Sequence, residues 1–342
     1  MRRLFAILQV LLIFSFPSRG QTGGDNTYEF LNLSTDALVT ALGGINISVA
    51  ADNPTMTFYN PALLSVTTQN HFSLNYVNYF AGINYGSASW TSNIEKAGRF
   101  AVGLLYLNYG TFEEADASGF ITGEFRASEY ALNLSWNYRF DSSFVAGVNV
   151  KPVLSQLEKY SSFGVAVDLG MLYTSKNGLT TAALAIKNLG MQITTYTGIR
   201  ENLPLLVTAG VTTKPEHAPF RLSVTANNLQ KYDLTTSYTD EEKEKEENMT
   251  LTSSLSENLM RHFVIGVEFI PSSSFFIAAG FNYQRRKEMA IDYRRSTVGF
   301  SSGFGIRLTS FDLTYSRSKF HLAGSVNNVS LLIKPEGFIK RK

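Results

Sequence analysis

The sequence predicts an all-β fold: a transmembrane antiparallel β-barrel of about 14 strands with a short N-terminal luminal plug. Three observations predict it. The N-terminus resembles an export signal, apolar and polar side chains alternate along many short segments, and short connections alternate with long ones. Only helices and closed barrels satisfy their backbone hydrogen bonds inside a bilayer, so alternating strands in a membrane indicate a barrel.

The first 20 residues are typical of a secretory signal peptide. Met1, Arg2 and Arg3 supply positive charge, residues 4–16 are almost continuously apolar, and residues 17–20 contain a proline and small residues. The apolar run is shorter than the roughly 20 residues of a spanning helix. A short buried helix is the alternative, but the order of charge, apolar run and small residues favours cleavage near Gly20 and Gln21.

The predicted organisation has four parts. Residues 1–20 form the signal peptide, residues 21–69 the plug, residues 70–333 the barrel and residues 334–342 a periplasmic tail. The orientation expected from this plan places both termini in the periplasm of a bacterial outer membrane, with lipid around the barrel.

Composition excludes several classes of protein. The chain has no cysteine, so it has no disulfide, no thiolate metal site and no acylated cysteine. Without residues 1–20, 27 basic residues stand against 28 acidic ones, a net charge of −1, and no basic patch favours nucleic acid. Only 17% of residues are charged, whereas 13% are aromatic. Strands with one face in lipid explain this combination.

Period-2 alternation is clear in residues 130–140, 220–227, 263–269 and 311–316. A soluble β-sandwich would also alternate, but its sheets usually hold about two to ten strands. The strands are expected to begin near His71, Ile83, Arg99, Glu124, Ser143, Ser161, Leu179, Pro204, Phe220, Arg261, Phe275, Arg294, Phe311 and His321.

The connections predict the orientation of the barrel. Connections after even-numbered strands are mostly short, whereas long stretches follow odd-numbered strands: residues 113–123, 190–203, 231–260 and 285–293. Outer-membrane barrels have short periplasmic turns and longer outer loops, which places the long stretches outside. Residues 80–82 form a tight odd connection and break the trend.

Residues 28–65 differ from the strands and predict the plug. Ser34, Thr35 and Asp36 are candidate N-caps for a short helix at residues 37–42, which Gly43 and Gly44 would end. Proline disfavours helical geometry in the residue before it, so turns are expected at residues 53–54 and 60–61. A compact segment before a closed barrel is well placed to lie inside it.

This segment also carries a resemblance. The order of residues 30–33 (FLNL), 41–44 (ALGG) and 60–65 (NPALLS) resembles the PorQ and PorV group of type IX secretion proteins, within the FadL-like barrel superfamily. The family motif is structural and falls on Ala41, Leu42, Gly43, Gly44, Asn60, Pro61 and Ala62. The resemblance is sharpest over about 40 residues and favours PorQ. One departure is that the chain ends at Lys342 and not on an aromatic residue.

The resemblance implies a function. The barrel would be an outer-membrane subunit of the type IX attachment complex and would anchor a PorZ-like surface protein, with the PorU sortase and the PorV barrel as further partners. The alternative is a FadL-like transporter of hydrophobic small molecules. The candidate partner-binding loop carries Asp240, Glu241, Glu242, Glu244, Glu246 and Glu247. A mixed-charge run of this kind is also typical of a solvated loop tip.

No residue is assigned a catalytic, metal-binding or cofactor-binding role, and no enzyme activity is expected. Residues 299–303 match the G-x-S-x-G pattern of serine hydrolases, but they fall inside a predicted strand and not at a strand–turn–helix junction. The four histidines lack a close metal-binding spacing. Asp168 is expected on a luminal face, paired with Arg139 or Arg307, because buried charges need partners.

Overall fold

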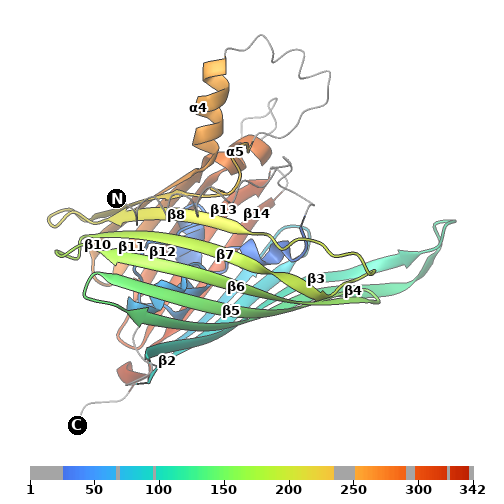
Figure 1. Cartoon of the computed structure of the whole chain (residues 1–342), viewed down its shortest axis with the longest axis horizontal. Coiled ribbons are helices and arrows are strands. Elements are labelled where there is room, and N and C mark those ends of the chain that lie inside the picture. The colour runs from blue at the N-terminus through green and yellow to red at the C-terminus, as the bar shows by residue number, and fades with distance from the viewer. Residues whose placement is uncertain are drawn as a thin grey trace, which may run out of the picture.

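The structure is a computed structural model that describes residues 26–66, 70–94, 98–234, 251–289, 297–321 and 324–338. Within these residues, fourteen strands form one closed antiparallel barrel, in which each strand pairs with its sequence neighbours and β1 pairs with β14 (Figure 1). The predicted fold class and number of strands are confirmed. The strands are β1 (Phe72–Asn78), β2 (Asn84–Ile94), β3 (Gly98–Ala115), β4 (Ile121–Arg139), β5 (Phe144–Leu157), β6 (Tyr160–Thr174), β7 (Thr180–Thr194), β8 (Leu206–Thr213), β9 (Phe220–Ala226), β10 (Phe263–Ser272), β11 (Phe275–Asn282), β12 (Phe300–Arg307), β13 (Phe311–His321) and β14 (Gly324–Ile333).

The predicted alternation places apolar side chains outside and mostly polar side chains inside. On β1, Phe72, Leu74 and Tyr76 are exposed on the outer face, whereas Ser73 and Asn75 are buried in the lumen. β4 repeats the pattern along residues 130–138. Exposed aromatic and aliphatic side chains on every strand suit a lipid-facing surface, and the polar inner faces require hydrogen-bonding partners in the lumen.

The two ends of the barrel differ. We call the end with the turns after even-numbered strands and the end of β14 the short-turn end, and the opposite end the loop end. At the short-turn end, two residues separate β10 from β11. The alternation of lengths is less strict than predicted, because residues 158–159 make an equally tight connection at the loop end. Which end faces outward stays a prediction.

Two predicted loops are largely strands. β3 and β4 continue through most of residues 113–123, and β7 continues to Thr194 through part of residues 190–203. β3 pairs with β2 only as far as Asn108, so the remainder of the β3–β4 hairpin is a two-stranded extension beyond the barrel wall (Figure 1). Phe120 and Ile121 are exposed near its tip.

Two helices lie at the loop end, where the sequence predicted only loops. α4 (Leu251–Arg261) and α5 (Tyr283–Met289) project from the barrel in Figure 1. Glu257 joins them, because its Oε1 lies 3.0 Å from Lys287 Nζ and 3.2 Å from Arg261 Nη2. β12 accordingly begins at Phe300 and not near Arg294. No helix in the described ranges is long and apolar enough to cross a membrane.

Residues 26–66 lie inside the barrel and are called the plug (Figure 1). The plug contains η2 (Glu29–Asn32), α2 (Ala37–Ala41), η3 (Pro54–Phe58) and η4 (Pro61–Val66). Asp36 caps α2 by accepting hydrogen bonds from the backbone N–H groups of Leu38 (2.8 Å) and Val39 (3.1 Å). Gly43 and Gly44 follow α2 with φ angles of 104° and 91°, as its predicted end requires.

Candidate functional site

The predicted family motif lies where the plug approaches the barrel wall most closely. A Cβ added to Gly280 of β11 would overlap the backbone of Leu42 and Gly43. A Cβ added to Gly147 of β5 would lie 2.5 Å from the carbonyl carbon of Pro61. Glycines in the wall therefore let the plug backbone approach the strands directly.

Hydrogen bonds from the wall reinforce this fit at α2. Asn328 Nδ2 donates to the Thr35 carbonyl (2.9 Å), and the backbone N–H of Ala37 donates to Ser330 Oγ (2.8 Å). Ser301 Oγ donates to the Ala41 carbonyl (2.8 Å). Ser301 lies in β12, as the sequence predicted for residues 299–303, and its hydroxyl binds the plug backbone.

A second set of hydroxyl contacts joins the middle of the plug to β1 and β8. Thr55 Oγ1 donates to Ser73 Oγ (2.9 Å) and accepts a hydrogen bond from Asn75 Nδ2 (2.9 Å). Ser48 Oγ and Thr212 Oγ1 are 2.8 Å apart. These buried polar side chains of the lumen thus find partners on the plug, which avoids the cost of leaving them unpaired.

A cavity of about 210 Å³ lies on the loop-end side of the plug. It is lined by apolar and polar side chains of the plug and of the wall near β7 and β8, including Ile47, Tyr59, Leu206 and Lys187. The Lys187 side chain is buried, and its ammonium group lies 5.8 Å from the centre of the Tyr59 ring. It makes no hydrogen bond or ion pair with any residue that the structure describes.

Beside Lys187, a bulge in β7 organises a buried ion pair. Lys151 Nζ lies 2.7 Å from Asp168 Oδ1, and Lys151 also donates to Asn188 Oδ1. Asn188 has a φ of 60° and donates its backbone N–H to Asp168 Oδ1 (2.8 Å). Asp168 is luminal and paired as predicted, but its partner is Lys151 and not Arg139 or Arg307.

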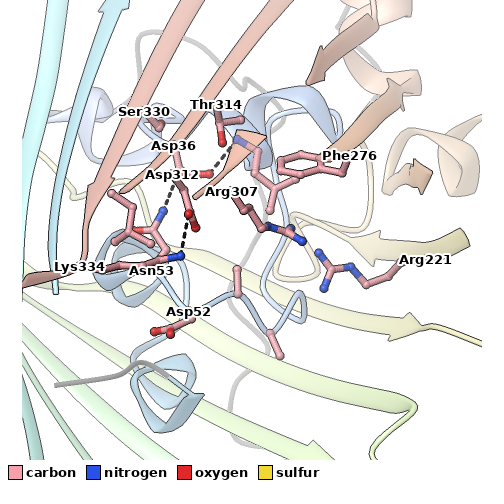
Figure 2. A pocket seen from close by; sticks show the side chains of 14 residues that line it. Asp36, Asp52, Asn53, Arg221, Phe276, Arg307, Asp312, Thr314, Ser330 and Lys334 are labelled. Atoms are coloured by element: carbon pink, nitrogen blue, oxygen red, sulfur yellow. Dashed lines mark hydrogen bonds and ion pairs between the residues drawn. The ribbon is translucent and has the colours of Figure 1, made fainter. Parts of the chain in front are cut away.

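A second cavity, of about 310 Å³, lies on the short-turn side of the plug. Figure 2 shows it between residues 50–53 of the plug and the ends of the last strands. Lys334 Nζ pairs with Asp312 Oδ1 (2.6 Å), and Arg221 binds both carboxylate oxygens of Glu268 (2.5 Å each). The guanidinium of Arg307 lies over the Phe276 ring, 4.6 Å from its centre.

At the rim of this cavity, His71 links the plug to the C-terminal segment. His71 Nε2 donates to Glu336 Oε1 (2.6 Å) in η5 (Pro335–Gly337), and Nδ1 lies 3.3 Å from the Asp52 carboxylate. The latter contact is ionic, because its geometry does not make a hydrogen bond. Burial alone lowers the pKa of His71, but Asp52 and Glu336 outweigh it and raise that pKa above its ordinary value. The hydrogen bond from His71 lowers the pKa of Glu336.

The predicted partner-binding residues, Asp240, Glu241, Glu242, Glu244, Glu246 and Glu247, lie outside the described residues, as does the signal peptide. No group of three or more His, Asp or Glu side chains in the described part of the chain could hold a metal ion.

Arg221, Arg307 and Lys187 were not predicted as site residues. Each is a charged residue in a segment of otherwise apolar or small residues, and this pattern could have marked it as a candidate site residue.

The fold and its contents define a class: a closed, 14-stranded antiparallel β-barrel with an N-terminal plug in its lumen. No family model and no curated protein matches the sequence. Solved structures do match. The Ralstonia pickettii toluene transporter TbuX aligns over 88% of this chain and 98% of its own, with 13% identity and a TM-score of 0.54. The Pseudomonas putida toluene transporter TodX aligns over 88% and 97%, with 12% identity and a TM-score of 0.51.

A Pseudomonas aeruginosa FadL homologue aligns over 87% of this chain and 98% of its own, with 12% identity and a TM-score of 0.50. At these identities the likeness establishes the fold alone. It extends over nearly the whole length of each solved chain.

Proposed function

We propose that this protein carries hydrophobic small molecules across the outer membrane and that its plug is the gate. The observation that carries the proposal is the placement of the plug between two cavities. One cavity lies on the loop-end side of the plug and the other on its short-turn side. A solute that passes from one cavity to the other must displace plug residues. The toluene transporters that share the fold support this choice of solute class.

The contacts of the plug suit a gate. Small-molecule sites are typically concave and combine apolar surface with placed polar groups. Both cavities are concave and combine the two, although polar and charged residues form most of each lining. Several contacts that hold the plug are single hydrogen bonds between hydroxyl groups, such as Ser48–Thr212 and Thr55–Ser73. Each neutral hydrogen bond contributes only about 0.5–1.5 kcal/mol, so local shifts of the plug require little free energy.

The test is to lock the plug to the wall. Since the chain has no cysteine, Ser48→Cys with Thr212→Cys introduces one defined disulfide where two oxygens lie 2.8 Å apart. We expect cells that express the oxidised double variant to lose uptake of radiolabelled toluene and to recover it after reduction. The measurement is the initial rate of uptake in a strain whose own transport is deleted.

The two single-cysteine variants are the matched controls and should take up toluene at the unmodified rate. A second lock, Thr55→Cys with Ser73→Cys, tests the other side of the plug at a contact of 2.9 Å. If both locked proteins transport as well as their reduced forms, the plug is not the gate and the proposal fails.

Anchoring a surface protein, the role implied by the PorQ and PorV resemblance, is a second candidate. The β3–β4 extension favours it, because Phe120 and Ile121 are exposed near a tip that lies beyond the barrel wall. Exposed apolar side chains on a projecting hairpin suit a docking surface for a PorZ-like protein, with PorU and PorV as further members. The acidic loop remains a candidate surface for the same partner.

Two deletions separate the functions. Removing residues 116–120 or residues 231–260 should release the surface protein and abolish secretion of cargo if the barrel is an anchor, while toluene uptake continues. Loss of uptake with normal secretion favours the transporter. Recovery of an unchanged complex from both deletions would contradict the anchoring role.

A further inference from the structure

Arg307 is a cation at the short-turn cavity on which the carboxylates of Glu268 and Asp312 act only at longer range. Its guanidinium contacts the face of Phe276, and the structure gives it no hydrogen bond or ion pair with a residue of the described ranges. The other charged side chains that line this cavity differ. Lys334 pairs with Asp312, Asp52 lies beside His71, and Asp36 accepts hydrogen bonds from Leu38 and Asn53.

Arg307 also faces a second guanidinium. Figure 2 shows the side chains of Arg307 and Arg221 pointing toward one another across the cavity. Arg221 uses Nε and Nη2 to bind Glu268, which leaves its Nη1 without a described partner. Two cations that face one another in a half-buried space repel, and an anion between them would relieve that repulsion and accept hydrogen bonds from both.

The apolar residues of the cavity indicate what the rest of the ligand, beyond its anionic group, should be. Phe276 presents one face of its ring to Arg307, while Leu38 of the plug and Leu332 of β14 line the same cavity. Apolar surface and two guanidinium groups thus line one cavity. A volume of about 310 Å³ admits a single aromatic ring with a short substituent and restricts long chains.

We propose that this cavity is a binding site for a small aromatic carboxylate, held by Arg221 and Arg307 through its carboxylate and by Phe276 and Leu38 through its ring. The role of this cavity as a subsite for a transported solute rests on the proposed function, whereas the binding of the carboxylate itself does not depend on transport. The site distinguishes an aromatic acid from a neutral aromatic hydrocarbon, because only the acid supplies a charged oxygen that can accept hydrogen bonds from Arg307.

Equilibrium dialysis of radiolabelled benzoate against the full chain in lipid nanodiscs tests the site. We expect saturable binding that unlabelled toluene and acetate displace at least about tenfold less well than benzoate, since each lacks one half of the ligand. Arg307→Gln should weaken benzoate binding about tenfold or more, because a hydrogen bond between charged groups is lost. Arg307→Lys should retain part of the affinity.

Arg317→Gln is the matched control, because Arg317 is an exposed arginine on the adjacent strand β13 and does not line the cavity. It should bind benzoate as the unmodified protein does. Heat-modifiable migration and circular dichroism establish that each variant is a folded barrel. Equal benzoate binding by Arg307→Gln, or displacement by acetate as effective as by benzoate, would overturn the proposal.

Failure of the transport proposal would look different. If locking the plug leaves toluene uptake intact while benzoate binding still depends on Arg307, the anion site stands and the gate does not. If locking abolishes uptake but benzoate fails to bind, the gate stands and the anion site is wrong.

Discussion

Gly147 is a residue at which the wall and the plug are fitted to one another. Its Cβ position lies 2.5 Å from the carbonyl carbon of Pro61 and 2.6 Å from the backbone nitrogen of Ala62. We expect Gly147→Val to displace η4 and to destabilise the folded protein by about 1–3 kcal/mol, the usual cost of overpacking. The measurement is the midpoint of thermal unfolding, together with the permeability of cells to a bulky antibiotic.

Gly123→Val is the control for this change. Gly123 is also a strand glycine, but its Cβ would meet only the flexible end of Glu114, at 3.3 Å, in the β3–β4 extension. It should unfold at the same temperature as the unmodified protein. Equal effects of the two substitutions would mean that the loss reflects strand glycines in general and not contact with the plug.

Residue contacts across the lumen were the hardest feature to predict. The sequence placed Asp168 on a luminal face and required a cationic partner for it, and both expectations are correct. It could not choose Lys151, because the choice depends on strand register and on the bulge at Asn188. Arg221 and Arg307 meet for the same reason, since β9 and β12 are not neighbours in the barrel.

At the scale of elements, the His71 contact predicts a pH dependence for the link between plug and C-terminal segment. Because the folded state raises the pKa of His71, protonated His71 stabilises the folded protein. This stabilisation is complete below the unfolded pKa of about 6.5 and is lost as the pH rises through the folded pKa. Because the folded state lowers the pKa of Glu336, its ionised carboxylate stabilises the folded protein. This stabilisation is present above the unfolded pKa of about 4.3 and is lost as the pH falls through the folded pKa.

We therefore expect the thermal unfolding temperature to fall as the pH rises from about 6.5 toward 8, and His71→Gln to flatten this fall. Thermal unfolding followed by circular dichroism across this range is the measurement. His217→Gln, in the exposed turn between β8 and β9, should leave the pH profile unchanged. A His71→Gln profile that retains the full slope would assign the dependence to another group.

Strands were predicted better than helices and connections. Alternation identifies a strand wherever one face lines the lumen and the other is apolar and exposed, and the predicted starts of β9, β11 and β13 coincide with the observed ones. Alternation is lost where both faces of a strand are exposed, so the ends of β3 and β4 resembled a loop. α5 lies in a charged stretch without a clear apolar period. α4 carries leucine at residues 251, 255 and 259, a helical spacing that was overlooked because residues 231–260 were interpreted as one long loop.

At the scale of the whole molecule, the barrel and the plug depend on one another. The inner faces of the strands carry buried serine, threonine and asparagine side chains, and the plug supplies many of their partners. A barrel without the plug would expose these groups to water, whereas the plug alone has too little apolar surface to fold. The N-terminal segment and the strands therefore specify one structure together.

The orientation of this structure in the membrane gives the last prediction. Ser118 lies in the loop-end connection between β3 and β4, and Ser142 lies in the short-turn connection between β4 and β5, so both flank the same strand. Each is exposed, and the chain has no cysteine of its own. Because outer-membrane barrels keep their short turns in the periplasm, we expect a membrane-impermeant maleimide to label Ser118→Cys on intact cells. Ser142→Cys should be labelled only after the outer membrane is permeabilised. The reverse pattern would invert the barrel, and the Arg221 and Arg307 cavity would then face the medium as the first site that a solute meets.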